Sequence, residues 1–303
     1  MAKNSSKKNL SYFSAFTLIE IMVVIVIIAV LAGIVMALNS GATQKAIDTK
    51  VRTFANGIPM SLSGNYVASW KFDQINVPAA NQTPSAWGDY PGTLSGLSLP
   101  TLQTTGCVDS NCLYFNGVDA TTYSYVNVPS DLTTGLKALT FECWVNGQQA
   151  ANIIKSENNS IILHFRGAGF YLFASDDTAS NYLGWNSTLA YNVWTHLVAT
   201  WDGATMKLYV NGTRQASTLA FAGGAANKLH PSTYSWIGHY FNSGQLGFKG
   251  YMDELRFYNE ALSIGQIREN YYAGVNKLLA KNIITVVDYQ NRIAQINNNL
   301  ANK

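Results

Sequence analysis

The pattern of hydrophobic and polar positions changes sharply along this chain of 303 residues. Residues 16–38 form an unbroken apolar run that contains a single charge, Glu20. A helix of this run would be about 35 Å long at about 1.5 Å per residue, enough to cross the roughly 30 Å hydrocarbon core of a bilayer. A carboxylate inside such a span costs at least about 2.5 kcal/mol. Glu20 therefore predicts a cationic partner.

An amphipathic pattern follows the apolar run. Its apolar positions recur at spacings of three and four and are Ile47, Val51, Phe54, Ile58 and Leu62. This spacing places them on one face of a helix. Gly57 and Pro59 predict a kink or an end near residue 57. We therefore expect an N-terminal helix over residues 16–62, of which 16–38 is the membrane or assembly part.

From about residue 64 the chain consists of short aromatic and β-branched runs separated by Gly, Asn and Asp. The candidate strands are LYFNG, YSYVNV, LTFECWVNG, NIIKSEN, SIILHFRG, GFYLFAS, WTHLVATWDG, MKLYVNG, STYSWIGHY and GYMDELRFYN. Such runs are typical of β-strands, and the Asp202-Gly203 and Asn211-Gly212 pairs suit tight hairpin turns. Because no helical pattern lies between them, we predict a mainly β fold of two antiparallel sheets packed face to face over residues 63–262.

The last segment, residues 263–303, returns to a helical period. Ser263 with Gln266 and Thr285 with Asp288 each have the spacing of a capping box at the start of a helix, and Gly274 predicts the end of the first one. The second helix has an apolar stripe that must be covered. We expect a helical hairpin, with a contact to a neighbouring subunit as the alternative.

The N-terminus carries a specific motif. A leader of residues 1–15 contains Lys3, Lys7 and Lys8 and no acid, which favours a cytoplasmic N-terminus. The string Ala15-Phe16-Thr17-Leu18-Ile19-Glu20 resembles the processing site of type IV prepilins and pseudopilins. The resemblance implies that a prepilin peptidase cuts between Ala15 and Phe16, that Phe16 is N-methylated, and that Glu20 pairs with the N-terminal amine of a neighbouring subunit. Ala15 departs from the usual Gly, and an ordinary signal anchor is the alternative.

Composition agrees with an exported protein anchored by a single helix. The chain is 48% hydrophobic and 12% charged, which suits a folded core. Removing the three leader lysines from 20 basic residues leaves 17, equal to the 17 acidic residues. The mature chain is thus neutral, which argues against nucleic-acid binding.

A second resemblance lies in the β-rich region. Six segments resemble, in order, landmarks of laminin G-like modules of the concanavalin A-like lectin/glucanase superfamily: WKFD at 70–73, LYFNG at 113–117, LTFECWV at 139–145, WTHLVATWDG at 194–203, LYVNG at 208–212 and FKGYMDELRFYN at 248–259. The resemblance implies a jelly-roll sandwich used for adhesion to carbohydrate or protein, with the ligand unspecified. Aromatic residues that could stack on sugar rings are Trp87, Trp185, Trp236, Tyr240 and Phe241.

We predict that the sandwich is not an enzyme. Glycoside hydrolases need a pair of carboxylates at a set distance, and no such cluster occurs in the sequence. The glutamates of the region are scattered: Glu142, Glu157, Glu254, Glu260 and Glu269. The histidines are isolated: His164, His196, His230 and His239. His196 lies within a strand pattern, which favours a buried, hydrogen-bonded side chain over a catalytic one.

Calcium is the one metal that the resemblance suggests. Sandwiches of this superfamily often hold a structural Ca²⁺ between an acid near the first strand and an acid on the last, here Asp73 and Asp253, with Asp119 a weaker candidate ligand. The equal alternative is that Asp73 and Asp253 accept hydrogen bonds from loop amides.

Three cysteines remain. A Cys107–Cys112 disulfide is plausible outside the cytoplasm and would contribute about 2 kcal/mol on the loop-entropy model, leaving Cys143 as a free, buried thiol. The alternative is that all three stay reduced, because spacing alone proves no bond.

These patterns together predict a type IV pilin-like subunit. It would sit in the bacterial inner membrane as a single-pass precursor, then join other pilin subunits in a pilus or pseudopilus at the cell surface and display the sandwich for adhesion. A pseudopilin of a type II secretion system is the first alternative. A membrane-tethered glycan hydrolase is the second, and the missing carboxylate pair argues against it.

Overall fold

The computed structural model consists of two units, residues 1–50 and 51–303. The structure describes residues 19, 22–23, 25–29, 66–75, 81–86, 90–117, 123–129, 132–133, 135–157, 161–165, 169–173, 180–184, 188–221, 229, 231, 233–239 and 247–301. In the first unit, the described residues are helical and their large apolar side chains, such as Ile19 and Ile25, are exposed. No helix formed by described residues has the length and apolar character needed to cross a membrane. Most of the membrane span predicted for 16–38 lies outside them.

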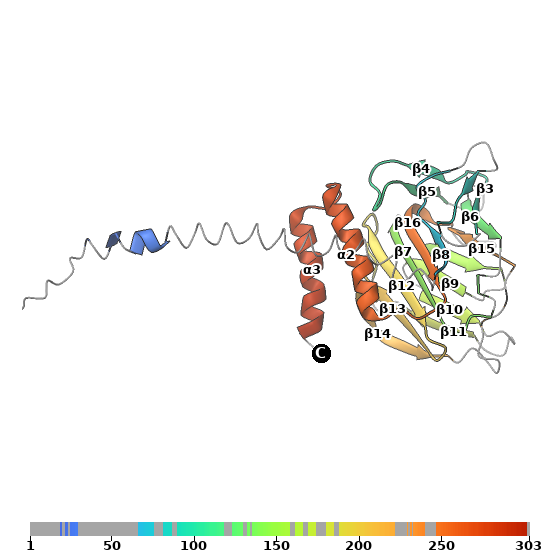
Figure 1. Ribbon diagram of the computed structural model, residues 1–303. Helices are drawn as coiled ribbons and strands as arrows, with labels where there is room; N and C mark the ends of the chain where they lie inside the picture. Colours follow the sequence, from blue (N-terminus) through green and yellow to red (C-terminus); the bar gives the residue numbers. More distant parts are fainter. Residues whose placement is uncertain are drawn as a thin grey trace, which may run out of the picture. The chain divides into compact units, whose positions relative to one another are not determined.

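The second unit is an antiparallel β-sandwich, as predicted (Figure 1). The first sheet has the order β14-β13-β12-β7-β16-β5-β4, with β1 also paired to β16. Its strands are β1 (Tyr66–Trp70), β4 (Thr101–Gln103), β5 (Cys112–Asn116), β7 (Leu139–Gly147), β12 (Thr195–Trp201), β13 (Thr205–Val210), β14 (Thr213–Ala220) and β16 (Lys249–Tyr258).

The second sheet has the order β11-β10-β9-β8-β15-β6-β3-β2. Its strands are β2 (Gln82–Thr83), β3 (Gly92–Gly96), β6 (Ser124–Pro129), β8 (Ala151–Ser156), β9 (Ile161–Phe165), β10 (Gly169–Phe173), β11 (Ser180–Gly184) and β15 (Tyr234–Ile237). The main core lies between the two sheets, and β7 and β8 illustrate it: Phe141 and Val145 of the first sheet and Ile153 of the second are fully buried there.

The central strands of the first sheet are buried on both faces. On β7, Phe141, Cys143 and Val145 belong to the core between the sheets, whereas Trp144 belongs to a second cluster with the C-terminal helices. All seven residues of β12 are buried as well. Side chains alternate between the faces of a strand, so full burial requires a cover on the outer face.

Two helices provide that cover. Figure 1 shows α2 (Ile264–Ala280) and α3 (Val286–Ala301) side by side on the outer side of the sheet that holds β12 and β13. Their shared cluster includes Val275 and Leu278 from α2 and Tyr289 and Ile296 from α3. The structure thus confirms the predicted hairpin.

Gly274 does not end the first helix, and that prediction was wrong. Helix α2 continues to Ala280, and Lys281 follows as its C-terminal cap. A Cβ atom at Gly274 would lie 2.3 Å from Cζ2 of Trp144. This glycine therefore allows close packing of α2 on β7 rather than a turn. The capping boxes themselves are confirmed at Ser263 with Gln266 and at Thr285 with Asp288.

Candidate functional site

The processing and assembly residues predicted from the N-terminal motif fall outside the described part of the chain. These are Ala15, Phe16 and Glu20. Among the described residues, the sandwich and its helical hairpin form three polar sites.

The first polar site surrounds Glu142, which has no exposed surface and lies on the outer face of β7 beneath α2. Its Oε1 atom lies 2.8 Å from Nε2 of His196 on β12 and 3.3 Å from Nη1 of Arg256 on β16. Its Oε2 atom accepts hydrogen bonds from the Tyr258 hydroxyl at 2.9 Å and from Nδ2 of Asn270 at 2.8 Å. Strand register creates this site, since His196 pairs with Trp144 and Arg256 pairs directly with Glu142.

Both carboxylate oxygens of Glu142 have hydrogen-bonding or ionic partners. Burial alone raises the pKa of a carboxyl, but here the hydrogen bond from His196, the charge of Arg256 and the Tyr258 hydroxyl outweigh it and lower the pKa of Glu142. The expected buried, hydrogen-bonded state of His196 is confirmed. Glu142 joins three strands and α2, so its observed contacts are those of a structural residue.

The second polar site is the loop of residues 107–112, which a disulfide between Cys107 and Cys112 closes. Cys143 is free and buried, and burial raises the pKa of its thiol. The loop binds two of the acids that we considered for calcium. The backbone N–H of Asn111 donates to Oδ1 of Asp73 at 2.9 Å, and the backbone N–H of Asp109 donates to Oδ2 of Asp253 at 2.8 Å.

The carboxyl group of Asp253 has fewer hydrogen-bond partners than that of Glu142. It lies on β16 at a bulge where Glu254 has a positive φ of 49°. Its Oδ1 atom is buried and has no hydrogen-bond partner among the described residues. Burial raises the pKa of Asp253 well above its usual range, and the nearby charge of Glu254 adds to the shift.

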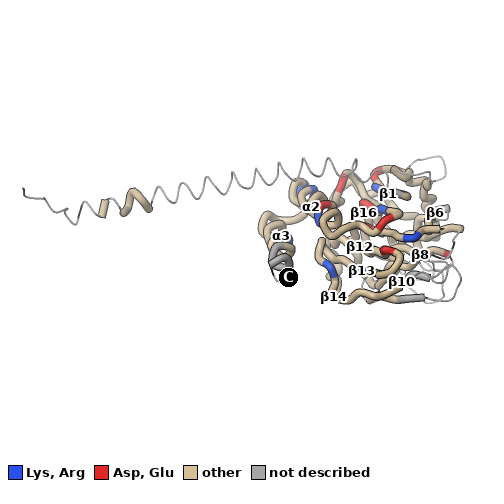
Figure 2. Tube along the Cα trace, turned by 60° about the horizontal axis from the view of Figure 1, so that its bottom comes forward, with Lys and Arg blue, Asp and Glu red and all other residues tan. Residues whose placement is uncertain are grey.

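Lys277 of α2 and Lys281, the C-terminal cap of that helix, complete this loop site. Figure 2 shows basic positions of the chain in blue and acidic positions in red. Nζ of Lys277 donates to Oδ2 of Asp109 at 2.7 Å, and Nζ of Lys281 contacts the carbonyl oxygens of Cys107 and Asp109. Burial opposes ionisation of Asp109, but hydrogen bonds with Glu254 and Lys277 lower its pKa to about 2. The loop thus ties the hairpin to the sheet.

Calcium binding stays a prediction. Within the described ranges, no three His, Cys, Asp and Glu residues are grouped so that they could hold a metal. Asp73 and Asp253 do bond loop amides, which is the alternative that the sequence left open. The Oδ1 atom of Asp253, which has no hydrogen-bond partner among the described residues, suits a cation. Asp119 lies outside the described residues.

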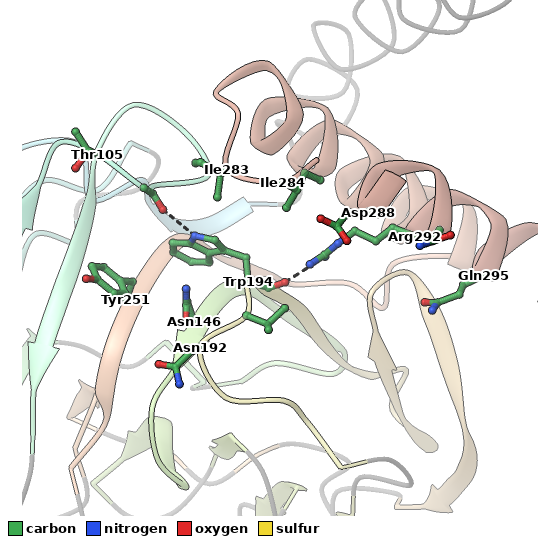
Figure 3. A pocket seen from close by; sticks show the side chains of 13 residues that line it. Thr105, Asn146, Asn192, Trp194, Tyr251, Ile283, Ile284, Asp288, Arg292 and Gln295 are labelled. Carbon is green, nitrogen blue, oxygen red and sulfur yellow. Dashed lines mark hydrogen bonds between the residues drawn. The ribbon is translucent and has the colours of Figure 1, made fainter. Parts of the chain in front are cut away.

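The third polar site is a cleft between the sheet and the hairpin, which we call the hairpin cleft (Figure 3). Its volume is about 710 Å³. One wall holds Trp194 and Tyr251, whose ring centroids are 6.3 Å apart, and the opposite wall is the start of α3. The indole nitrogen of Trp194 donates to the carbonyl oxygen of Gly106 at 2.8 Å, and Arg292 of α3 donates to the carbonyl oxygen of Trp194 at 3.2 Å.

The hairpin cleft is lined by neutral polar side chains together with the apolar side chains of Val193, Ile283 and Ile284. Asn146 ends β7 opposite Tyr251, and the backbone of Asn192 bonds Gly147 next to it. The one carboxylate among the lining residues is Asp288, which caps α3 by accepting hydrogen bonds from Thr285. The cleft therefore has no pair of carboxylates for glycoside hydrolysis. Its chemistry suits binding through amides and aromatic rings.

The sequence did not predict this cleft, because five separate segments form it. Of the aromatic residues considered for sugar stacking, only Trp236 lies in the described part, on β15, where Lys155 sits 5.5 Å from its ring. His164 and His239 are separate from the cleft, and burial lowers the pKa of His164 to about 4. The remaining histidine, His230, lies outside the described residues.

Comparison with protein families identifies both parts of the chain. Residues 10–36 match the prokaryotic N-terminal methylation motif, and residues 119–268 match the concanavalin A-like lectin/glucanases superfamily. The chain thus joins a pilin-type N-terminus to a lectin-like domain. It is a pilin-like surface protein whose motif implies processing by a prepilin peptidase and assembly with other pilin subunits. No curated protein matches the chain.

Solved structures share the fold at low sequence identity. Domain 4 of AbnA, a GH43 extracellular arabinanase from Geobacillus stearothermophilus, in complex with arabinotriose, has a TM-score of 0.52 and 19% identity over 68% of this chain and 97% of that one. The binding domain of Paraclostridial Mosquitocidal Protein 1 has a TM-score of 0.52 and 11% identity over 71% and 53%. The botulinum neurotoxin serotype G binding domain has a TM-score of 0.50 and 12% identity over 70% and 51%. The chain spans about half the length of the two toxin domains.

Proposed function

We propose that this protein is a subunit of a type IV pilus that displays its lectin-like domain for adhesion to carbohydrate or to a surface protein. The observation that carries the proposal is the methylation motif at residues 10–36, joined in one chain to the domain at 119–268. The arabinotriose bound to the similar arabinanase domain supports a sugar ligand, because it shows that this fold can hold one.

The assembly step would use the apolar run and Glu20. Before assembly, residues 16–38 lie in lipid, where a helix satisfies its own backbone groups. In the fibre, the same residues form the centre, and burial of their apolar surface holds the polymer together. The new amine of Phe16 in one subunit pairs with Glu20 of another, so that the burial cost of both charges is offset.

Glu20→Val tests this assembly step. The change makes the span more apolar and leaves the Ala15-Phe16 bond intact, so insertion and leader removal should be normal. The amount of the variant in sheared surface fibres, relative to the membrane fraction, should fall roughly tenfold or more. The reason is that the amine of Phe16 would be buried without its partner, and an unpaired buried charge costs about 3–5 kcal/mol. Thr17→Val is the matched control, since it removes a nearby polar group without a charge. Wild-type recovery of Glu20→Val in fibres would show that Glu20 is not the assembly residue.

The alternative role as a pseudopilin of a type II secretion system shares the same N-terminus. The two roles differ in where the head ends up. Antibody labelling of whole cells should find the sandwich along surface fibres. Labelling confined to permeabilised cells, together with loss of secreted proteins on deletion, would favour the pseudopilin.

A further inference from the structure

The hairpin cleft has unused hydrogen-bonding groups. Four amide side chains line it from three parts of the fold: Asn146 at the end of β7, Asn192 before β12, and Asn291 and Gln295 on α3. None of these side chains makes a hydrogen bond with any part of the chain that the structure describes. An amide both donates and accepts, as a hydroxyl group does, so the four can serve adjacent hydroxyls of one ligand.

The charge of the cleft argues for a neutral ligand. Arg292 and Asp288 are the charged side chains among the lining residues, and their charges cancel. Each is already engaged, Arg292 with the carbonyl of Trp194 and Asp288 with Thr285. Binding of a phosphate or another acidic ligand normally relies on a cluster of free arginines, which these lining residues do not include.

The walls favour a sugar over a peptide. Tyr251 is half-buried and contributes an aromatic ring to the wall, whereas Trp194 is almost fully buried. An aromatic ring beside amides suits the apolar face and the hydroxyls of a sugar. A peptide that adds to a sheet needs a free strand edge. The strands that line the cleft, β7 and β16, each pair with neighbours on both sides.

We propose that the hairpin cleft binds a segment of a neutral oligosaccharide, with Asn146, Asn192, Asn291 and Gln295 bonding its hydroxyl groups and Tyr251 contacting a ring face. This proposal rests on the adhesive function proposed above and assigns its site. The C-terminal helices thereby have a role in binding besides covering the sheet, because α3 supplies two of the four amides.

The test compares variants of the full chain in detergent on an array of neutral and acidic oligosaccharides, followed by titration with the neutral glycan bound best. The double variant Asn291→Ala with Gln295→Ala removes two exposed helix side chains and places a strong helix former at each position, so the fold is expected to survive. Affinity should drop about tenfold or more, since each net hydrogen bond lost costs roughly two- to tenfold. Gln290→Ala, an exposed amide of α3 outside the cleft, is the matched control and should bind like wild type.

A second variant tests Asn192, which lines the cleft on the side opposite α3. Asn192 has a positive φ of 58°, so Asn192→Gly removes the amide and keeps a backbone conformation that glycine adopts readily. It should weaken binding about two- to tenfold. Equal binding by wild type and both cleft variants would show that the hairpin cleft is not the binding site, and the proposed adhesion to glycans would be unaffected. Binding of acidic glycans alone would overturn the neutral ligand, and binding of no glycan would overturn the proposed sugar ligand and the cleft together.

Discussion

Glu142 on β7 and Asp253 on β16 are carboxylates of the same sheet, and neither has any exposed surface. Their surroundings differ. Glu142 has two strand partners, a tyrosine hydroxyl and an amide from α2, and these lower its pKa. Asp253 accepts from one loop backbone amide, its other oxygen has no hydrogen-bond partner in the described part of the chain, and burial raises its pKa. A buried charge is stable where partners converge, and elsewhere the carboxyl takes up a proton or needs a cation.

The two carboxylates connect the helical hairpin to the sheet in different ways. At Glu142, Asn270 of α2 is a direct partner, so helix and sheet share one ionic site. At Asp253, the link to α2 is indirect, through the disulfide loop and Lys277. The first link depends on the sheet register, and the second depends on the disulfide.

The largest predicted effect is at Glu142. Glu142→Ala should lower the free energy of unfolding by about 3–5 kcal/mol, because it removes the buried carboxylate to which His196, Arg256 and Asn270 bond. Urea unfolding of wild type and variant measures the difference. Glu269→Ala, on a partly exposed acid of α2, is the control and should change stability by about 0.5 kcal/mol or less. An equal, small change in both variants would mean that the Glu142 site contributes little.

The disulfide should have the next largest effect. Replacing Cys107 and Cys112 together by serine should cost about 2 kcal/mol on the loop-entropy model. The loss should appear as faster amide exchange in residues 281–288, because Lys277 and Lys281 of α2 bind the closed loop. A reducing agent should act on the wild type in the same way and should not affect the double variant. A reductant-induced loss in the double variant as well would assign the effect to another group.

Among the sixteen strands of the described residues, the sequence predicted ten and missed six, which are β1, β2, β3, β4, β11 and β14. All ten predicted runs of aromatic and β-branched residues are strands. Strand β14 was missed since it lies at a sheet edge with mostly exposed, polar residues. Strand β2 has two residues and gives no period to detect. Such strands form because their neighbours offer hydrogen bonds, which a local pattern does not contain.

The polar sites could be predicted only in part. The sequence marks His196 as buried, but its partner Glu142 is 54 residues away and is brought opposite by strand pairing. A charged residue inside a strand that is apolar on both sides, as in FECWV, was the available signal for Glu142. The hairpin cleft gave no signal, because its amides look like ordinary surface residues until α3 lies against the sheet.

The last predicted effect distinguishes a proton from a calcium ion at Asp253. A folded-state pKa above the unfolded value of about 3.9 means that the folded protein binds the proton more tightly. The stability that this proton provides is complete below about pH 4 and is lost as the pH rises through the folded-state pKa. Asp253→Asn cannot ionise, so it should be more stable than wild type at pH 7, and this gain should vanish near pH 4. Urea unfolding of both proteins at pH 4, 5.5 and 7 in a chelator measures the gain. Asp73→Asn is the control, because the carboxylate of Asp73 faces the same loop.

A calcium ion between Asp73 and Asp253 would reverse these results: added calcium would raise the melting temperature of wild type, and Asp253→Asn would then be the less stable protein. That outcome would also show that the loop site needs a cation to complete it, whereas Glu142 is complete with protein groups alone.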